Sequence, residues 1–326
     1  MKKLYLTVLA FCVLAVATLF LLPNNTDSAN ESVKTSNKSS TPEVIADTPK
    51  LADTFLWKLE KAGSPTSYLL GTLHLGRVNE ELSSSIMDAF DATTAVVTEA
   101  NVMPENQELF EISMLMMDMQ GSLSQKLGQG RFNQLANAVA GVAPKSALEK
   151  MRPWAALTLV MYNKPDGYSE QFGIDMLLTK KAIERGKHRV FLEQIQDSLS
   201  LFSQLPEDKV ISLIGVLLDY SSEAKADTLE LINLYKNNKF NEVAALLTDK
   251  EKMLKYYPEE EKEFWDGWMN QELLNKRNTN WLPILREQLE LEPTLVAVGA
   301  MHLVGEDGLI EQAKQMGYTV TPVLPH

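Results

Sequence analysis

A short apolar run near the C-terminus, TLVAVGAMHLVGE from Thr294 to Glu306, gives the strongest indication of the fold. A continuous apolar run of this length is typical of a strand that is covered on both faces. Gly299 ends the run, and His302 follows three residues later. In open α/β sheets, ligands bind at the carboxyl ends of the strands, so His302 lies where a functional site is expected.

The same frame occurs far upstream in SYLLGTLHLG, from Ser67 to Gly76. Here Gly71 ends the run, and His74 follows three residues later. The chain has only 4 histidines and 16 glycines in 326 residues. Each histidine therefore has roughly a one-in-twenty chance of a glycine at this offset. Two such pairs, both after strand-like runs, favour one shared functional site for the histidines over two unrelated core positions.

Four other segments have the short apolar or β-branched pattern of strands. They are FLWKLE (55–60), TAVVTE (94–99), HRVFLE (188–193) and YTVTPVL (318–324). Two of them end in a glutamate, Glu99 and Glu193. Two imidazoles together with carboxylates are common ligands of divalent metals, so both glutamates are site candidates. Asp175 in FGID is a weaker candidate, because an acid at a helix start commonly serves the helix dipole alone.

The middle of the chain has a different pattern. Apolar residues recur at three- and four-residue spacing in 105–120, 146–162 and 174–186, and 206–257 is also helix-like. We predict an α/β (α+β) fold with a central mixed sheet. Strands from both ends of the chain contribute to this sheet and flank a large helical insert of about 104–291.

The N-terminus has the pattern of a targeting segment. Lys2 and Lys3 precede an uncharged, mostly apolar stretch that ends at Leu22, so residues 1–22 are predicted to be a signal peptide or an N-terminal membrane anchor. Residues 23–50 are rich in Asn, Ser, Thr and Pro and are predicted to be a disordered linker, before a globular body at 51–326. The protein is expected to be exported, periplasmic or extracytoplasmic. If the segment is not cleaved, it anchors the protein in the membrane.

Composition and missing motifs exclude several classes of function. A net charge of −12 argues against a nucleic-acid partner. The single cysteine, Cys12, lies in the N-terminal apolar stretch, so the body has no thiol for a disulfide, a zinc site or a nucleophile. The sequence also lacks GxSxG, HExxH, P-loop and GxGxxG motifs, which argues against serine hydrolases, zincins, NTPases and dinucleotide enzymes.

Taken together, these motifs resemble the TraB/PrgY/GumN family, which includes the Tiki-type metalloproteases. The similarity extends from about Leu56 to Val323. It rests on YLLGTLHLG, VVTEAN, QFGIDMLLTKKAIERGKHRVFLEQIQ, LLNKRNTNW, and TLVAVGAMHLVGEDGLI followed by GYTVTPV. The resemblance implies a sheet built from two related halves, each of which contributes one strand followed by GxxH.

The resemblance also implies roles for individual residues. The matching positions are His74 and His302 of the GxxH motifs, Glu99 after the next strand, Asp175 of GxD, Glu193 of LE, and the pair Arg277–Asn278. His74, Glu99 and His302 are then expected to hold a divalent metal, with Mn²⁺ or Co²⁺ favoured. Glu99 or Glu193 is the expected general base, and Arg277 is expected to stabilise an oxyanion. The expected substrate is a peptide or an exported protein.

One departure from the family keeps other functions open. The family often has a second acid shortly after the first glutamate, whereas this chain has Asn101. The loss of one acid weakens the expectation of catalysis. A non-catalytic protein that binds a peptide or a metal-containing ligand, and so sequesters a signal, is therefore one alternative. A structural or export-associated role is another.

Overall fold

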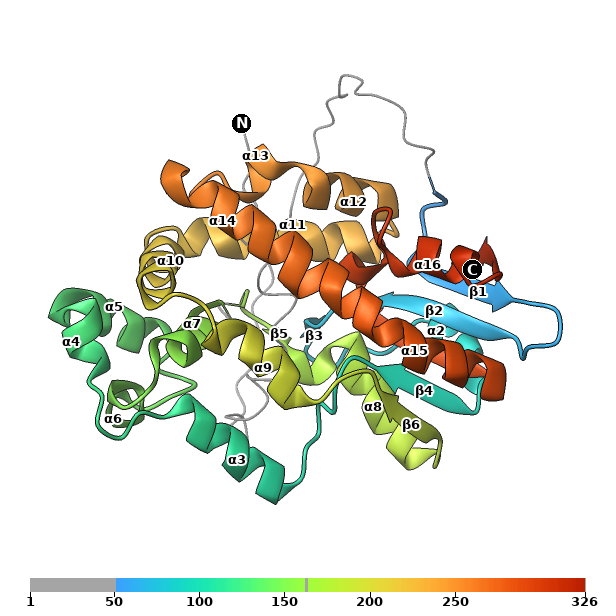
Figure 1. Ribbon diagram of the computed structural model, residues 1–326, viewed down its shortest axis with the longest axis horizontal. Helices are drawn as coiled ribbons and strands as arrows, with labels where there is room; N and C mark the ends of the chain where they lie inside the picture. Colours follow the sequence, from blue (N-terminus) through green and yellow to red (C-terminus); the bar gives the residue numbers. More distant parts are fainter. Residues whose placement is uncertain (1–50, 162–163, 326) are drawn as a thin grey trace.

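The computed structural model describes residues 51–161 and 164–325. Its centre is a six-stranded mixed sheet with the strand order β6-β4-β7-β2-β1-β8 (Figure 1). The strands are β1 (Leu56–Glu60), β2 (Ser67–Thr72), β4 (Ala95–Thr98), β6 (His188–Phe191), β7 (Thr294–Gly299) and β8 (Thr319–Pro322). β6, β4, β7 and β2 are parallel neighbours, whereas β1 pairs with β2 and β8 in antiparallel fashion. The predicted mixed α/β sheet is confirmed.

All six predicted strands are present in this sheet, and β7 has the bounds of the TLVAVG run. Every residue of β4 and β7 is buried, which explains their uninterrupted apolar sequence. A second, two-stranded sheet of β3 (Gly76–Arg77) and β5 (Tyr168–Ser169) is not predicted by the sequence pattern. Two-residue strands are too short to show a periodic pattern.

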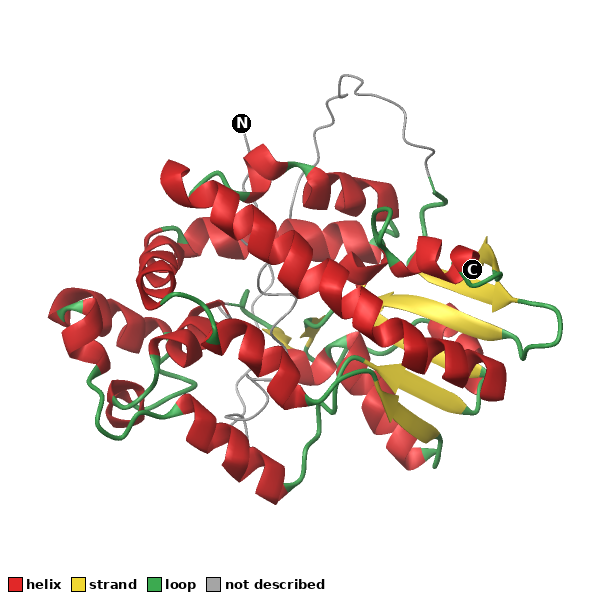
Figure 2. Ribbon diagram, viewed as in Figure 1, coloured by secondary structure: helices red, strands yellow, loops and turns green. Residues whose placement is uncertain are grey.

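Helices surround the sheet and make up most of the middle of the chain (Figure 2). In Figure 1 the sheet lies at the right, and most of the helices between α3 and α14 lie to its left. The α-helices are α2 (Ser84–Asp91), α3 (Asn106–Met116), α4 (Leu123–Leu127), α5 (Gln129–Ala138), α6 (Lys145–Glu149), α7 (Pro153–Met161), α8 (Ile174–Glu184), α9 (Ile195–Ser203), α10 (Glu207–Asp219), α11 (Ser221–Lys236), α12 (Phe240–Thr248), α13 (Lys250–Met253), α14 (Lys262–Gly267), α15 (Lys276–Leu291) and α16 (Leu309–Gln315). Three 3₁₀-helices, η3 (Glu170–Phe172), η4 (Glu259–Glu261) and η6 (Ala300–Leu303), and one π-helix, η5 (Trp268–Asn275), complete the described elements.

The two faces of the sheet belong to separate apolar clusters. Leu295 and Ala297 of β7 lie in one cluster together with residues of α2 and α8, such as Phe90 and Leu178. The alternate residues of β7 lie in the larger cluster, which includes residues of α15, α16 and the helical insert. Because side chains alternate along a strand, one apolar run supplies both clusters.

Strand register brings the expected site together at one edge of the sheet. Thr72 at the end of β2 pairs with Gly299 at the end of β7, and Thr98 at the end of β4 pairs with Ala297 and Phe191. The four parallel strands therefore end at the same edge. The residues that follow them in sequence meet there, although they are distant along the chain.

One long helical segment crosses toward this edge. It runs through α14, the π-helix η5 and α15 without a break from Lys262 to Leu291. π-Helical segments are rare and are frequent at functional sites, because they shift the register of the residues that follow. Here the π-helix ends at Asn275, two residues before Arg277, which lies in the first turn of α15.

The predicted signal peptide or anchor at 1–22 and the predicted linker at 23–50 lie outside the described residues. Among the residues that are described, no helix is both long enough and apolar enough to cross a membrane. The export of the protein and its anchoring therefore stay predictions.

Candidate functional site

The two glycine–histidine pairs lie next to each other. His74 follows β2 and His302 lies in η6 directly after β7, and both are buried, with 5% and 1% of their surface exposed. Close packing explains both glycines. A Cβ at Gly71 would lie 3.0 Å from the Cα of Ala300, and one at Gly299 would lie 3.2 Å from Glu99 Oε1 and 3.3 Å from His74 Nε2.

The two predicted glutamates follow adjacent parallel strands. The backbone N–H of Glu193 donates to the carbonyl oxygen of Glu99 over 2.9 Å, so the two residues continue the pairing of β4 with β6. Glu99 Oε1 accepts a hydrogen bond from the backbone N–H of Gly299 at 2.7 Å. The same oxygen lies 3.8 Å from His302 Nε2. Glu99 is thus fixed against the end of β7, beside His302.

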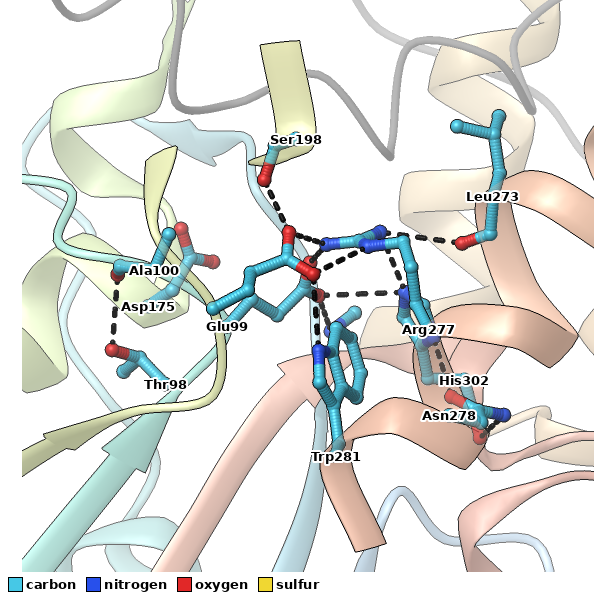
Figure 3. A network of polar contacts seen from close by, with 12 residues as sticks. Thr98, Glu99, Ala100, Asp175, Ser198, Leu273, Arg277, Asn278, Trp281 and His302 are labelled. Atoms are coloured by element: carbon cyan, nitrogen blue, oxygen red, sulfur yellow. Dashed lines mark hydrogen bonds and ion pairs between the residues drawn. The ribbon is translucent and has the colours of Figure 1, made fainter. Parts of the chain in front are cut away.

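Arg277 is the centre of the polar network (Figure 3). Its Nη2 donates to Glu99 Oε2 at 2.6 Å and to Glu193 Oε1 at 2.8 Å, and its Nε donates to Glu193 Oε2 at 3.0 Å. Nη1 lies 3.2 Å from His302 Nε2 and donates to the carbonyl oxygen of Leu273 at 3.3 Å. One guanidinium therefore joins both carboxylates to one imidazole.

The Nδ1 atom of each imidazole contacts an acceptor. His74 Nδ1 lies 2.9 Å from Asp175 Oδ1, and His302 Nδ1 lies 2.7 Å from Asn278 Oδ1. The amide nitrogen of Asn278 donates to the carbonyl oxygens of His302 and Asp307, which leaves its oxygen toward the ring. His302 is therefore the Nδ1–H tautomer, with its Nε2 lone pair toward Arg277. Acceptors of this kind orient metal-binding histidines and raise their basicity.

Trp281 packs beneath this network. Its indole N–H donates to Glu193 Oε2 at 3.0 Å, and its ring lies 4.5 Å from the ring of His302 and 4.8 Å from the guanidinium carbon of Arg277. The hydroxyl of Ser198 donates to Glu193 Oε1. Glu193 therefore accepts hydrogen bonds from three different side chains, and both of its oxygens are engaged.

Burial and neighbouring charges set the protonation of the site. Burial raises the pKa of Glu99, but Arg277 and the two histidines outweigh it and lower the pKa to about 2. Burial lowers the pKa of His302 to about 3, with Arg277 adding to the effect. The pKa of His74 is raised despite its burial, because Asp175 and Glu99 favour the imidazolium. At neutral pH the site therefore holds an ionised Glu99 and a neutral His302.

A small cavity of about 30 Å³ opens among these groups. Its lining is Thr72, His74, Thr98, Glu99, Ala100, Val102, Asp175, Ser198, Arg277 and Ala297. Two buried oxygens from this lining, Thr72 Oγ1 and Asp175 Oδ2, have no hydrogen-bond partner among the described residues. A cavity of this size holds a water molecule, and such oxygens are the partners that a water or a cation would take.

The donor chemistry of the site fits a divalent cation. The carboxylates of Glu99 and Glu193 contact the guanidinium of Arg277, and a third carboxylate, that of Asp175, contacts His74, so there is a formal excess of negative charge. In the part of the chain that the structure describes, however, no three His, Cys, Asp or Glu side chains are gathered closely enough to hold a metal. The guanidinium of Arg277 contacts both His302 and Glu99 where a metal would need them.

The structure joins all the predicted site residues in one place, although their roles in binding and catalysis stay predictions. Asn101, at the position where the family often has a second acid, lies apart from the site. Its side-chain oxygen accepts from the backbone N–H of Met103 at 3.1 Å, and it does not line the cavity. Trp281, Ser198 and Thr72 also belong to the site, although the sequence motifs do not predict them. Trp281 could have been found, because it lies one helical turn after Arg277 on α15.

The sheet and its buried polar edge define an α/β protein with an enclosed histidine–carboxylate–arginine site. The chain belongs to the TraB/PrgY/gumN family, whose model matches residues 55–322. This match confirms the family that the sequence motifs predict. No curated protein and no solved structure matches the chain.

Proposed function

We propose that the protein is an exported, divalent-metal-dependent hydrolase of the peptidase type. The main support is the convergence of His74 Nε2, Glu99 Oε1 and the His302 ring around Gly299, within 3.7 Å of the position that a Cβ would take there. Each imidazole has an acceptor at Nδ1, the arrangement that prepares the other ring nitrogen for a metal.

In this proposal His74, Glu99 and His302 hold the ion. Imidazole nitrogens and a carboxylate bind several first-row divalent metals, and the family resemblance favours Mn²⁺ or Co²⁺ among them. When bound, a divalent metal lowers the pKa of its water ligand toward neutrality. The low pKa of His302 keeps its ring neutral, as a metal ligand must be, whereas the raised pKa of His74 means that an ion would displace a proton from that ring.

The two glutamates have different roles in this proposal. Glu99 lines the cavity, so it is the carboxylate that can accept a hydrogen bond from a water there and orient it. Glu193 does not line the cavity, and both its oxygens accept hydrogen bonds from Arg277. We therefore assign the positioning of the water to Glu99 and the anchoring of Arg277 to Glu193. Arg277 also lines the cavity and places positive charge where an oxyanion would form.

The expected substrate is a peptide or an exported protein. A cavity of about 30 Å³ takes a water but no peptide, so the carbonyl to be cleaved must reach Glu99 from outside. Ala100 and Val102 line this cavity beside Glu99. The segment that carries them is the part that we expect to move when a substrate binds.

Hydrolysis of a peptide library tests the proposal directly. The full chain is stripped with a chelator, reloaded with Mn²⁺ and assayed by mass spectrometry for cleaved peptides. His302→Ala is expected to abolish cleavage. His188→Ala, which changes an exposed histidine paired with Glu292, is expected to leave it intact. Equal cleavage by the wild type and His302→Ala would refute the mechanism.

A second candidate is a protein that binds a peptide or a metal-containing ligand without turnover. Asn101 favours it, because its side chain engages its own backbone where the family often has an acid. Tight binding of a ligand with no product by mass spectrometry would decide for this function.

Fractionation of cells and N-terminal sequencing of the protein test export and the fate of residues 1–22.

A further inference from the structure

Arg277 contacts two of the three groups that the proposed function assigns to the metal. Its Nη1 lies 3.2 Å from His302 Nε2, and its Nη2 donates to Glu99 Oε2 at 2.6 Å. Only 6% of the Arg277 side chain is exposed, so this positive charge lies inside the protein. A buried carboxylate without a partner costs free energy, and here the guanidinium of Arg277 is the partner of Glu99.

We propose that Arg277 is an internal cation that exchanges with the metal. It neutralises the site when no metal is bound and gives up Glu99 and His302 when a divalent ion binds. The inference rests on the proposed function, since it concerns the same three ligands. It makes Arg277 a competitor of the metal, and Arg277 thereby limits the affinity of the site.

Contacts with other partners hold Arg277 in place while it gives up Glu99 and His302. Nε and Nη2 both donate to Glu193, and Nη1 also donates to the carbonyl oxygen of Leu273. The ring of Trp281 lies 4.8 Å from the guanidinium carbon. None of these three partners is a proposed metal ligand. Nη2 already divides its hydrogen bonds between Glu99 and Glu193, so it can release the first and keep the second.

Charge and binding partners are conserved when the metal replaces Arg277. A divalent ion at His74, Glu99 and His302 supplies the positive charge that Glu99 loses when Arg277 withdraws. The Nε2 lone pair of His302 changes its partner from a guanidinium N–H to the ion. Each hydrogen bond to a charged group contributes enough free energy to change a binding constant by roughly tenfold or more. Removal of the competitor should therefore strengthen metal binding by at least that factor.

Calorimetric titration of the chelator-stripped full chain with MnCl₂ tests the exchange. Arg277→Met removes the internal cation, and we expect it to bind Mn²⁺ at least ten times more tightly than the wild type does. Lys276→Met is the matched control, because it removes the same charge from the neighbouring, exposed position of α15. That control should bind Mn²⁺ with nearly wild-type affinity.

A second variant covers the case in which Arg277→Met does not fold. Arg277→Lys keeps a positive charge, but a single ammonium cannot span both carboxylates and the imidazole. Its affinity for Mn²⁺ should lie between those of the wild type and Arg277→Met. If Arg277→Lys binds Mn²⁺ no more tightly than Lys276→Met does, the exchange is overturned. The proposed function is still in place in that case, provided that the wild type binds Mn²⁺. Absence of Mn²⁺ binding in every variant overturns both.

Discussion

The buried imidazole of His302 leads to a prediction for the stability of the metal-free protein. His302 is 1% exposed, and burial lowers its pKa from 6.5 to about 3. In the unfolded chain the same ring has its ordinary pKa. Between these two values the unfolded form binds a proton that the folded form does not, so acid favours unfolding.

The size of this effect follows from the two pKa values. Between pH 7 and pH 5 the folded ring stays neutral, whereas the unfolded ring becomes almost fully protonated. The free energy of unfolding should then fall by about 2 kcal/mol from this residue alone. His74 acts in the opposite direction, because its pKa is raised in the folded protein. A comparison with a variant of His302 isolates the one residue.

His302→Asn is the suitable variant, because the amide nitrogen of the new side chain can still donate to Asn278 Oδ1, as His302 Nδ1 does. Urea unfolding of both metal-free proteins at pH 5, 6 and 7 gives the free energy of unfolding. The wild type should lose about 2 kcal/mol more than the variant over this range. Parallel pH dependences in the two proteins would show that His302 is not held neutral by its burial.

Two further substitutions test the contacts around the site. Trp281→Phe keeps a ring beneath Arg277 but removes the hydrogen bond to Glu193, so urea denaturation should show a loss of about 1–2 kcal/mol; an unchanged midpoint would count against this bond. Gly299→Ala places a Cβ 3.2 Å from Glu99 Oε1, and calorimetry should show roughly tenfold weaker Mn²⁺ binding. Gly215→Ala, where a Cβ meets open space, is its control. Equal Mn²⁺ affinity in both variants would show that a Cβ at position 299 does not disturb Glu99.

The sheet could be predicted because its strands are buried on both faces. Burial of every residue in β7 leaves an uninterrupted apolar run, and this run marks the strand by itself. The paired strands β3 and β5 have two residues each, and no sequence pattern can mark them. Their pairing depends on contacts between segments that are far apart in the sequence.

The sequence pattern alone predicts the histidines and glutamates that follow strands, whereas Arg277 and Asn278 of α15 were expected only from the family resemblance. Glu99 and Glu193 were expected at the sheet edge, and both lie there. Asp175 has the sequence pattern of an ordinary helix-start acid, but the fold buries it against His74. Trp281 was missed because a tryptophan in an amphipathic helix commonly packs in the core, and its polar contacts depend on how α15 crosses the sheet.

Metal content is the most direct test of the central claim. The full chain, saturated with Mn²⁺ and freed of excess ion by gel filtration, is analysed by inductively coupled plasma mass spectrometry beside His74→Ala. We predict about one Mn²⁺ per chain in the wild type and almost none in the variant. No bound metal in the wild type, or equal metal in both proteins, would contradict the proposed metal site.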